Sequence, residues 1–317
     1  MINQSKVLGI CVSGRKNGNS SIILNELLRP AKEAGYQTEI LNLGTLNILS
    51  CKGCFGCSRS YRCVLKDDLE LIKTKIEEAD AIALVSPCYY LSAPSALKAI
   101  MDRSAAWAIN EMAGGKKKKY GAAVSAAGGE PFEFSLQRIY TSLFLELFNC
   151  EIVGQFTIGH AFHKGEVLLA PSGLRLVNEL GNNLIHSIEA DKCIKSEINE
   201  CESKLVCPYC LSDVFQIYKD GRLLCPVCGT DLKGTGNKPG LNRFSVEGTA
   251  EHKKHIIDNV IGGRLAEDEI NQRLQAYWNS DVLPQEDYKI DRELGEVKES
   301  LDWDDNAMDV LNARSKL

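Results

Sequence analysis

Four cysteines lie within a stretch of thirteen residues, in the pattern Cys-x2-Cys-x2-Cys-x5-Cys. They are Cys51, Cys54, Cys57 and Cys63. Glycines at positions 53 and 56 separate them and favour a loop, so no helix or strand is expected to run through the stretch. Four thiolates on one short loop match the ligand set of a four-iron four-sulfur (4Fe-4S) cluster, in which loop N–H groups also donate to the sulfurs. A zinc knuckle is the alternative, although structural zinc usually takes two separated cysteine pairs.

A second group of four cysteines has the spacing of a zinc ribbon. Cys207-Pro-Tyr-Cys210 is followed after fourteen residues by Cys225-Pro-Val-Cys228. Asp220-Gly221 between the two pairs predicts a hairpin turn that joins strands at 214–218 and 222–224. A unit of this size, at 203–233, is too small to fold without its metal. A single iron, as in rubredoxin, is the alternative ion; the interval between the pairs is short for it, which favours zinc.

The apolar runs and the cysteine content together predict the cellular compartment of the protein. No stretch approaches the length of a membrane-spanning helix, and the N-terminal apolar run is too short for the core of a signal peptide, so we expect a cytoplasmic protein. In a reducing compartment, the thirteen cysteines are better explained as metal ligands than as disulfides. The five outside the two motifs are expected to be small core residues or bystanders: Cys11, Cys88, Cys150, Cys193 and Cys201.

Charge is unevenly distributed along the chain. The formal net charge is −5, and residues 285–317 contain ten Asp or Glu against five Lys or Arg. The rest of the chain is therefore nearly neutral, and nucleic acid is an unlikely partner because no basic stretch would attract it. A Gly-rich linker at 233–242 precedes this end of the chain. Beyond it we expect a helical, acidic extension at 243–317 that packs on the body of the protein or on a second copy, with a separate partner protein as the alternative.

The first 202 residues alternate between strands and helices. Apolar runs predict five strands, at 6–12, 36–43, 81–85, 120–126 and 151–158. Residues with helical period follow each of them, and Pro30 is expected to kink the first helix or end it early. This order predicts an α/β fold with a doubly wound, five-stranded parallel sheet covered on both faces.

Small-residue loops follow three of these strands, where doubly wound sheets bind ligands. The loop at 13–21 precedes a helix and can bind a phosphate with its amides and hydroxyls, or can be a plain turn capped by Asn19 or Ser20. It is neither a P-loop nor a G-x-G-x-x-G loop. The tyrosines of the loop at 86–94 can stack on a ring or simply plug the end of the sheet. The small residues at 125–130 allow a flat ligand to approach, or merely make a turn.

Together these motifs resemble the flavodoxin-like NAD(P)H-dependent FMN reductases over about residues 5–200. The resemblance is carried by 13–20, by 87–90 with the downstream 95–103, and by 128–129. The cysteine loop after the second strand, at 50–64, resembles the iron–sulfur flavoprotein branch of that family. The resemblance implies a flavodoxin-like domain at 1–202 that binds FMN. The implied phosphate ligands are Ser13, Arg15, Asn17, Gly18, Asn19 and Ser20, and the implied flavin-ring contacts are Pro87, Cys88, Tyr89, Tyr90, Ser125 and Gly128.

The same resemblance implies an activity. We expect an oxidoreductase that moves electrons between a one-electron donor such as ferredoxin, or NAD(P)H, and an unnamed acceptor, through a 4Fe-4S cluster and FMN. A homodimer or homotetramer is implied, with the cluster near the flavin of a neighbouring subunit. The alternatives are a reductase of FMN, quinones or another small molecule, and a redox-sensing regulatory protein that binds a partner through the ribbon. No catalytic side chain is expected, because the three loops hold no His, Asp or Glu constellation.

Overall fold

The computed structural model describes residues 3–113, 118–129, 135–195, 206–219 and 221–231. The chain divides into two units, Met1–Ile261 and Gly262–Leu317. The predicted linker at 233–242, the acidic helical extension at 243–317 and Cys201 lie outside the described residues.

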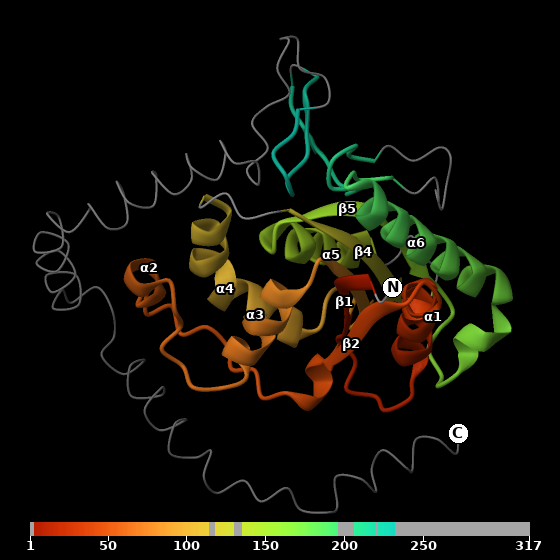
Figure 1. Cartoon of the computed structure of the whole chain (residues 1–317). Coiled ribbons are helices and arrows are strands. Elements are labelled where there is room, and N and C mark those ends of the chain that lie inside the picture. The colour runs from red at the N-terminus through yellow and green to blue at the C-terminus, as the bar shows by residue number, and fades with distance from the viewer. Residues whose placement is uncertain (1–2, 114–117, 130–134, 196–205, 220, 232–317) are drawn as a thin grey trace, which may run out of the picture. The chain divides into compact units, whose positions relative to one another are not determined.

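Five parallel strands form the central sheet, as predicted (Figure 1). Their order across the sheet is β2-β1-β3-β4-β5, which is the flavodoxin-like doubly wound topology. The strands are β1 (Asn3–Cys11), β2 (Tyr36–Asn42), β3 (Ala81–Pro87), β4 (Lys119–Ala126) and β5 (Cys150–Ile158). All seven residues of β3 are buried, as expected of a central parallel strand covered on both faces.

Helices cover both faces of the sheet (Figure 1). One face is covered by α1 (Asn19–Glu33) and α6 (Pro171–Ala190). The other face is covered by α3 (Leu69–Glu78), α4 (Ser95–Ala113) and α5 (Ser135–Leu147). Shorter elements are the 3-10 turns η1 (Leu43–Thr45) and η3 (Glu166–Leu169), the helical turn α2 (Cys57–Ser60), and the antiparallel pair β6 (Gln216–Ile217) and β7 (Leu223–Leu224).

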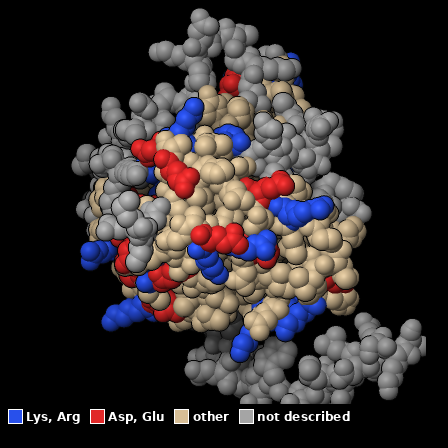
Figure 2. All heavy atoms as spheres, turned by 45° about the vertical axis from the view of Figure 1, so that its right-hand side comes forward, with Lys and Arg blue, Asp and Glu red and all other residues tan. Residues whose placement is uncertain are grey.

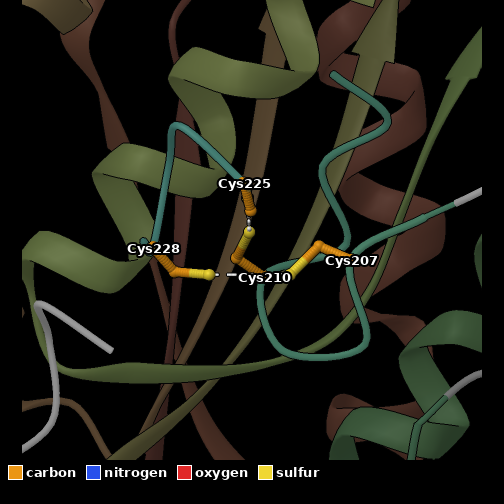
Figure 3. A group of neighbouring side chains, drawn as sticks. All are labelled: Cys207, Cys210, Cys225 and Cys228. Atoms are coloured by element: carbon orange, nitrogen blue, oxygen red, sulfur yellow. Dashed lines mark hydrogen bonds between the residues drawn. The ribbon is translucent and has the colours of Figure 1, made fainter. Parts of the chain in front are cut away.

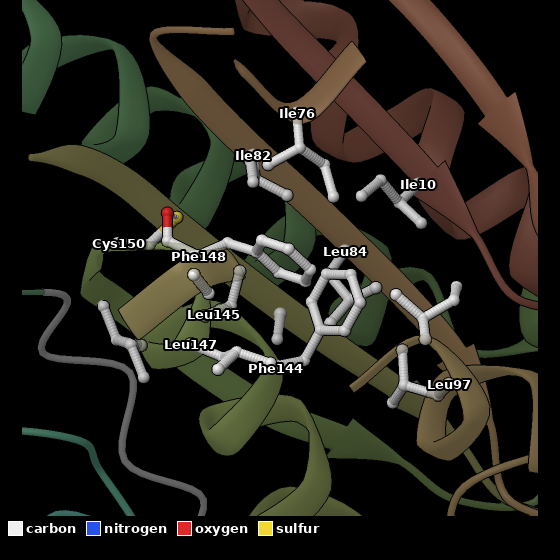
Figure 4. Close-up of a cluster of buried hydrophobic side chains, with 14 of the residues drawn as sticks. Ile10, Ile76, Ile82, Leu84, Leu97, Phe144, Leu145, Leu147, Phe148 and Cys150 are labelled. Carbon is white, nitrogen blue, oxygen red and sulfur yellow. Dashed lines mark hydrogen bonds between the residues drawn. The ribbon is translucent and has the colours of Figure 1, made fainter. Parts of the chain in front are cut away.

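The alternation of side chains along each strand divides the core into two apolar clusters. On β1, Leu8 and Ile10 point to the cluster under α3, α4 and α5. Phe144 of α5 lies at the centre of that cluster, with its ring centroid 4.8 Å from that of Phe148 (Figure 4). Val7 points to the opposite cluster under α1 and α6. Because both faces are buried, the register of the strands is strongly specified.

Three local expectations are wrong. The first helix does not end early at Pro30 but continues to Glu33, and Pro30 packs against α6 near Gly181. The N-cap of this helix is Gly18 rather than Asn19 or Ser20, and no side chain caps it. One helical turn, α2, does form within the cysteine stretch; it ends at Tyr61, whose φ of 54° is left-handed.

Charges do not gather by sign on the surface that Figure 2 shows, where basic and acidic side chains are interspersed. None of the helices in the described part of the chain combines the length and the apolar character that crossing a membrane requires.

Candidate functional site

A cavity of about 130 Å³ lies at the carboxyl ends of the strands, beside the parallel neighbours β1 and β3. The strands that follow them in the chain, β2 and β4, lie on opposite sides of this pair. Eight of the predicted flavin-site residues line it: Ser13, Arg15, Asn19, Ser20, Pro87, Cys88, Tyr89 and Gly128. Three residues that were not predicted complete the lining: Ala126, Ala161 and Phe162. A larger cavity of about 310 Å³ lies beside Trp107 and Phe148, near the start of β4, and contains none of the predicted residues.

The N-terminus of α1 forms one end of the smaller cavity. Ser13 and Ser20 are buried there, and the Ser13 hydroxyl accepts a hydrogen bond of 3.2 Å from the Arg15 amide. The amides of residues 21 and 22 bond to the Gly18 carbonyl, whereas the geometry of a first helical turn leaves the amides of Asn19 and Ser20 without intrahelical partners. These donors, two hydroxyls and the positive end of the helix dipole fit a phosphate group.

The side chain of Asn19 bonds to backbone groups of another loop. Its amide nitrogen donates to the carbonyls of Ala161, at 2.8 Å, and His163, at 2.7 Å. Its amide oxygen accepts from the backbone N–H of Gly165, at 2.8 Å. All of these groups belong to the loop after β5, so Asn19 fastens that loop to the start of α1 and can offer a ligand only its backbone amide.

The loop after β3 forms the opposite wall of the cavity. Its backbone turns tightly, since the amides and carbonyls of Tyr89 and Ser92 bond to each other, and Tyr90 and Leu91 have left-handed φ values of 48° and 65°. This turn points Tyr90 away from the cavity and leaves it 99% exposed, while Tyr89 lines the cavity. Burial raises the pKa of the Cys88 thiol to about 11, so this wall is uncharged at neutral pH.

Four predicted residues do not line the cavity. Asn17 and Gly18 lie in the same loop as the lining residues, and Asn17 has a left-handed φ of 52°. Ser125 is buried within β4, paired with Ser86 of β3, and Tyr90 is the exposed residue described above. These four residues lie in the same loops and strand as lining residues, but they are not part of the cavity surface.

The cysteine loop follows β2 and leaves the same edge of the sheet. Its two ends are tied together by the adjacent carboxylates of Asp67 and Asp68. Asp67 accepts from the amide of Leu49, and Asp68 from the amide of Asn47, each at 2.7 Å. The amide of Asp68 in turn donates to the Asn47 carbonyl at 3.1 Å, so the neck of the loop is closed by backbone and side-chain bonds.

All four thiols of this loop face one small cavity of about 20 Å³, together with Phe55, Val64 and Arg103. The backbone curls around it through left-handed φ values at Gly53, Phe55 and Tyr61. The amide of Gly53 donates to the sulfur of Cys51 at 3.4 Å, which is the kind of N–H to sulfur contact found around iron–sulfur clusters. Burial raises the pKa of Cys57, and the neighbouring thiols add to that effect. Four thiols that line one cavity, with an amide that donates to one of the sulfurs, fit a cluster.

The second set of cysteines converges much more tightly. The sulfurs of Cys207, Cys210, Cys225 and Cys228 lie within 4.8 Å of one another, all four side chains are buried, and they point to a common centre (Figure 3). The closest pairs are 3.5 Å apart. A tetrahedral ion with metal–sulfur bonds of about 2.3 Å needs sulfurs roughly 3.8 Å apart, so this arrangement fits a single metal ion.

The two halves of this metal site repeat one backbone turn. The amide of Leu211 donates to the Cys207 carbonyl at 3.0 Å, and the amide of Gly229 donates to the Cys225 carbonyl at 2.9 Å. Both donor residues have left-handed φ values, 57° and 82°. Bonds from Cys210 lower the pKa of Cys207, whereas bonds among the same sulfurs raise that of Cys210. Four thiols in such contact cannot all ionise together unless a cation joins them.

Residues 5–163 match the family described as NADPH-dependent FMN reductase. Two curated relatives are named "Iron-sulfur flavoprotein". The first, from Archaeoglobus fulgidus, is 30% identical over 187 residues, which cover 58% of this chain and 81% of the relative. The second, from Methanosarcina thermophila, is 30% identical over 191 residues, which cover 58% of this chain and 95% of the relative. The chain belongs to the FMN reductase family, in its iron–sulfur flavoprotein branch.

As a member of this family, the chain is a flavin-dependent oxidoreductase. A solved structure named "flavone reductase" shares its fold with a TM-score of 0.67, at 18% identity, over 88% of this chain and 100% of that one. The family match ends at residue 163, so the ribbon cysteines lie outside it.

Sequence reasoning missed the contribution of the loop after β5 to the cavity at the carboxyl ends of the strands. Phe162 packs so close to Gly128 that a Cβ on that glycine would lie 3.0 Å from the phenylalanine ring. The carbonyl of Phe162 also accepts a bond of 2.8 Å from the Arg15 guanidinium. The only signal for Ala161 and Phe162 was their position just beyond the fifth strand, at the edge where the other loops meet.

Proposed function

We propose that the chain transfers electrons between a one-electron donor such as ferredoxin, or NAD(P)H, and an acceptor, through FMN and a 4Fe-4S cluster. Cys51, Cys54, Cys57 and Cys63 hold the cluster in this proposal. When bound, FMN exchanges one or two electrons and the cluster exchanges one at a time, so the pair connects one-electron and two-electron chemistry.

A single observation carries this proposal: both ligand sets lie at the same edge of one sheet. The lining loops of the flavin cavity follow β1, β3, β4 and β5, and the cysteine loop follows β2. In a parallel sheet, all of these carboxyl ends meet at one edge. The cysteine loop also contacts α4, the helix that begins directly after the β3 loop, because Arg103 of α4 lines the thiol cavity.

The residues of the flavin cavity divide into two groups. We assign the phosphate to the backbone and hydroxyl donors at the start of α1, with Ser13, Arg15, Asn17, Gly18, Asn19 and Ser20 in its loop. We assign the flavin ring to the neighbourhood of Pro87, Cys88, Tyr89, Tyr90, Ser125 and Gly128. The lining of the cavity, as far as the chain is described, contains no His, Asp or Glu. We propose that the protein positions the flavin and supplies no acid–base side chain.

The ribbon cysteines Cys207, Cys210, Cys225 and Cys228 hold a zinc ion in this proposal, with a single iron as the other ion that four thiolates accept. A structural role follows from the burial of all four sulfurs, which leaves no open coordination position. We propose 203–233 as the ribbon, 1–202 as the flavodoxin-like domain and 243–317 as a separate extension.

We further propose a homodimer or homotetramer. Large apolar or aromatic side chains around both sites are exposed in the single chain, namely Phe55 at 69%, Phe162 at 65% and Tyr90 at 99%. A second copy that covers them would also enclose the flavin and the cluster, which excludes water from both.

The test is the cofactor content of protein purified without oxygen. We expect about four iron, four acid-labile sulfide, one zinc and one FMN per chain. Cys54→Ala should remove the sulfide and leave FMN bound, whereas Cys193→Ala, a half-buried thiol outside both motifs, should change neither. Rapid reduction of the flavin by NAD(P)H or by reduced ferredoxin would then identify the donor.

Two results would contradict the proposal in different ways. Wild-type protein with zinc but no sulfide would remove the cluster and leave a flavin reductase. If the oxidation state of the cluster changes how the protein binds a partner, and no donor supports turnover, the protein is instead a redox sensor.

A further inference from the structure

Arg103 is a buried cation at the neck of the cysteine loop. It lies on α4, and its side chain is 0% exposed. Its guanidinium makes a two-pronged ion pair with Asp67, in which Nη2 donates to Oδ1 at 2.8 Å and Nη1 donates to Oδ2. Nη1 also donates to the carbonyl of Leu49 at 2.9 Å. The remaining donor, Nε, points to the sulfur of Cys63 at 3.2 Å.

These bonds bring three separate parts of the chain to one group. Leu49 lies just before the first cysteine of the loop, Asp67 lies just after the last, and Cys63 is itself a thiol of the loop. Asp67 is also 0% exposed, and it accepts the amide of Leu49 in addition to the guanidinium. Since the planar fork of arginine fixes the directions of its donors, the ion pair with Asp67 determines where Nε points.

We propose that Arg103 is a positioning residue for the iron–sulfur cluster, holding Cys63 in place and donating a charged hydrogen bond to its sulfur. This inference rests on the proposed function, because it takes Cys63 as a cluster ligand. It adds a residue that the four-cysteine motif does not contain and assigns it two effects, one on assembly and one on the reduction potential.

The effect on potential has a definite sign. Reduction adds one negative charge to the cluster, and a cationic donor in contact with a ligand sulfur stabilises the more negative form. Hydrogen bonds to the sulfurs are among the factors that set cluster potentials. Removal of the Nε donor should therefore lower the potential, so that less of the cluster is reduced at a given applied potential.

The effect on assembly follows from burial. The Arg103 guanidinium is always charged in a protein, and within the neck it is paired with the buried carboxylate of Asp67. Without it, Asp67 is left as a buried carboxylate and the Leu49 carbonyl loses a donor, so the two ends of the loop are held less firmly. The four thiols should then collect iron less completely.

Arg103→Lys and Arg103→Gln test the inference in the full-length, anaerobically purified protein. Lysine keeps the charge, but it cannot reproduce the fork that bonds to Asp67 and Cys63 together. Arg29→Lys and Arg29→Gln are matched controls, because Arg29 is half exposed and pairs only with Glu26 on its own helix among the ion pairs described. We would measure iron and sulfide per chain, the cluster midpoint potential by redox titration, and FMN content with thermal stability as the check on folding.

For Arg103→Lys we expect FMN to remain bound, together with a drop in iron per chain or a lower potential. At the wild-type midpoint, the ratio of reduced to oxidised cluster should fall about tenfold, which is 59 mV for a one-electron couple. Arg103→Gln should show a larger change; if it does not fold, Arg103→Lys alone decides.

Iron content and potential equal to those of the Arg29 variants would overturn the inference while leaving the proposed function intact. Wild-type protein without acid-labile sulfide would overturn the proposed function, and this inference with it. The two failures are therefore distinguishable, because the first is seen only in the variants and the second already in the wild type.

Discussion

Gln155→Leu should loosen the ribbon and destabilise the protein. Gln155 lies on β5, is 5% exposed, and its amide nitrogen donates to the carbonyl of Leu211 at 2.8 Å and to the hydroxyl of Ser142 at 2.7 Å. Ser142 donates in turn to the carbonyl of Cys210 at 2.9 Å. Two consecutive carbonyls of the metal-binding turn are thus held by buried polar groups of the flavodoxin-like domain.

The expected loss of stability follows from the two hydrogen bonds that leucine cannot donate. A leucine fills a similar volume, but it leaves the Leu211 carbonyl without its 2.8 Å donor in a partly buried site. An unsatisfied buried acceptor costs about 1–3 kcal/mol, and the lost bond between Gln155 and Ser142 adds about 1 kcal/mol. A total of about 2–4 kcal/mol should lower the melting temperature by roughly 5–15 °C for a domain of this size. Substitution of a residue that hydrogen-bonds to a metal-binding residue typically weakens metal binding about 10–100-fold.

The assay compares thermal unfolding by circular dichroism with the rate of metal release to a chromogenic chelator. Gln216→Leu is the matched control, because Gln216 is an exposed glutamine in the ribbon itself. We expect faster metal release and a lower melting temperature for Gln155→Leu only. If both variants behave alike, the ribbon is not held by this network and the reasoning is refuted.

Three further perturbations test other parts of the structure. Gly44→Ala would bring a Cβ within 2.3 Å of the backbone of Gly14, so the loop at 13–21 must shift by about 1 Å or more. The affinity for FMN, measured by flavin fluorescence, should therefore fall about tenfold. A wild-type affinity would contradict the close contact between Gly44 and Gly14. Ser20→Glu should expel FMN by repulsion from the phosphate, and stoichiometric flavin after purification would place the phosphate elsewhere. The bond with Arg103 lowers the pKa of Asp67 in the folded protein. The ionised carboxylate therefore stabilises the fold at any pH above the ordinary aspartate pKa of about 3.9. This contribution is lost as the pH falls through the lower pKa of the folded state. Asp67→Asn should therefore be less stable than wild type at pH 7, and the difference in unfolding free energy should shrink towards pH 3; a difference independent of pH would exclude this origin.

Local patterns in the sequence were sufficient to predict the five strands and the two cysteine motifs. A strand such as Ala81–Pro87 is recognisable because a central parallel strand is buried on both faces and must be apolar throughout. The spacing of the ribbon cysteines was equally informative, since a tetrahedral site requires short turns with fixed intervals. The left-handed φ at Gly229 is part of that requirement.

Local irregularities were less predictable. The helix that contains Pro30 continues to Glu33, because a proline in a last turn removes only one hydrogen bond and packing against α6 favours the helix. The single turn α2 in the cysteine loop forms between Gly56 and Tyr61, in a stretch too short for any periodic signal.

The sequence by itself determined the five strands, their parallel arrangement and the two four-cysteine motifs, because apolar runs and cysteine spacing are features of short stretches of the chain. Only the tertiary structure decided how distant residues are used. The side chain of Asn19 binds carbonyls more than 140 residues away, Phe162 lines the cavity at the carboxyl ends of the strands, and Arg103 reaches Cys63 forty residues back. A parallel sheet gathers the carboxyl ends of all its strands at one edge, and the partners met there leave no trace in the spacing of either segment.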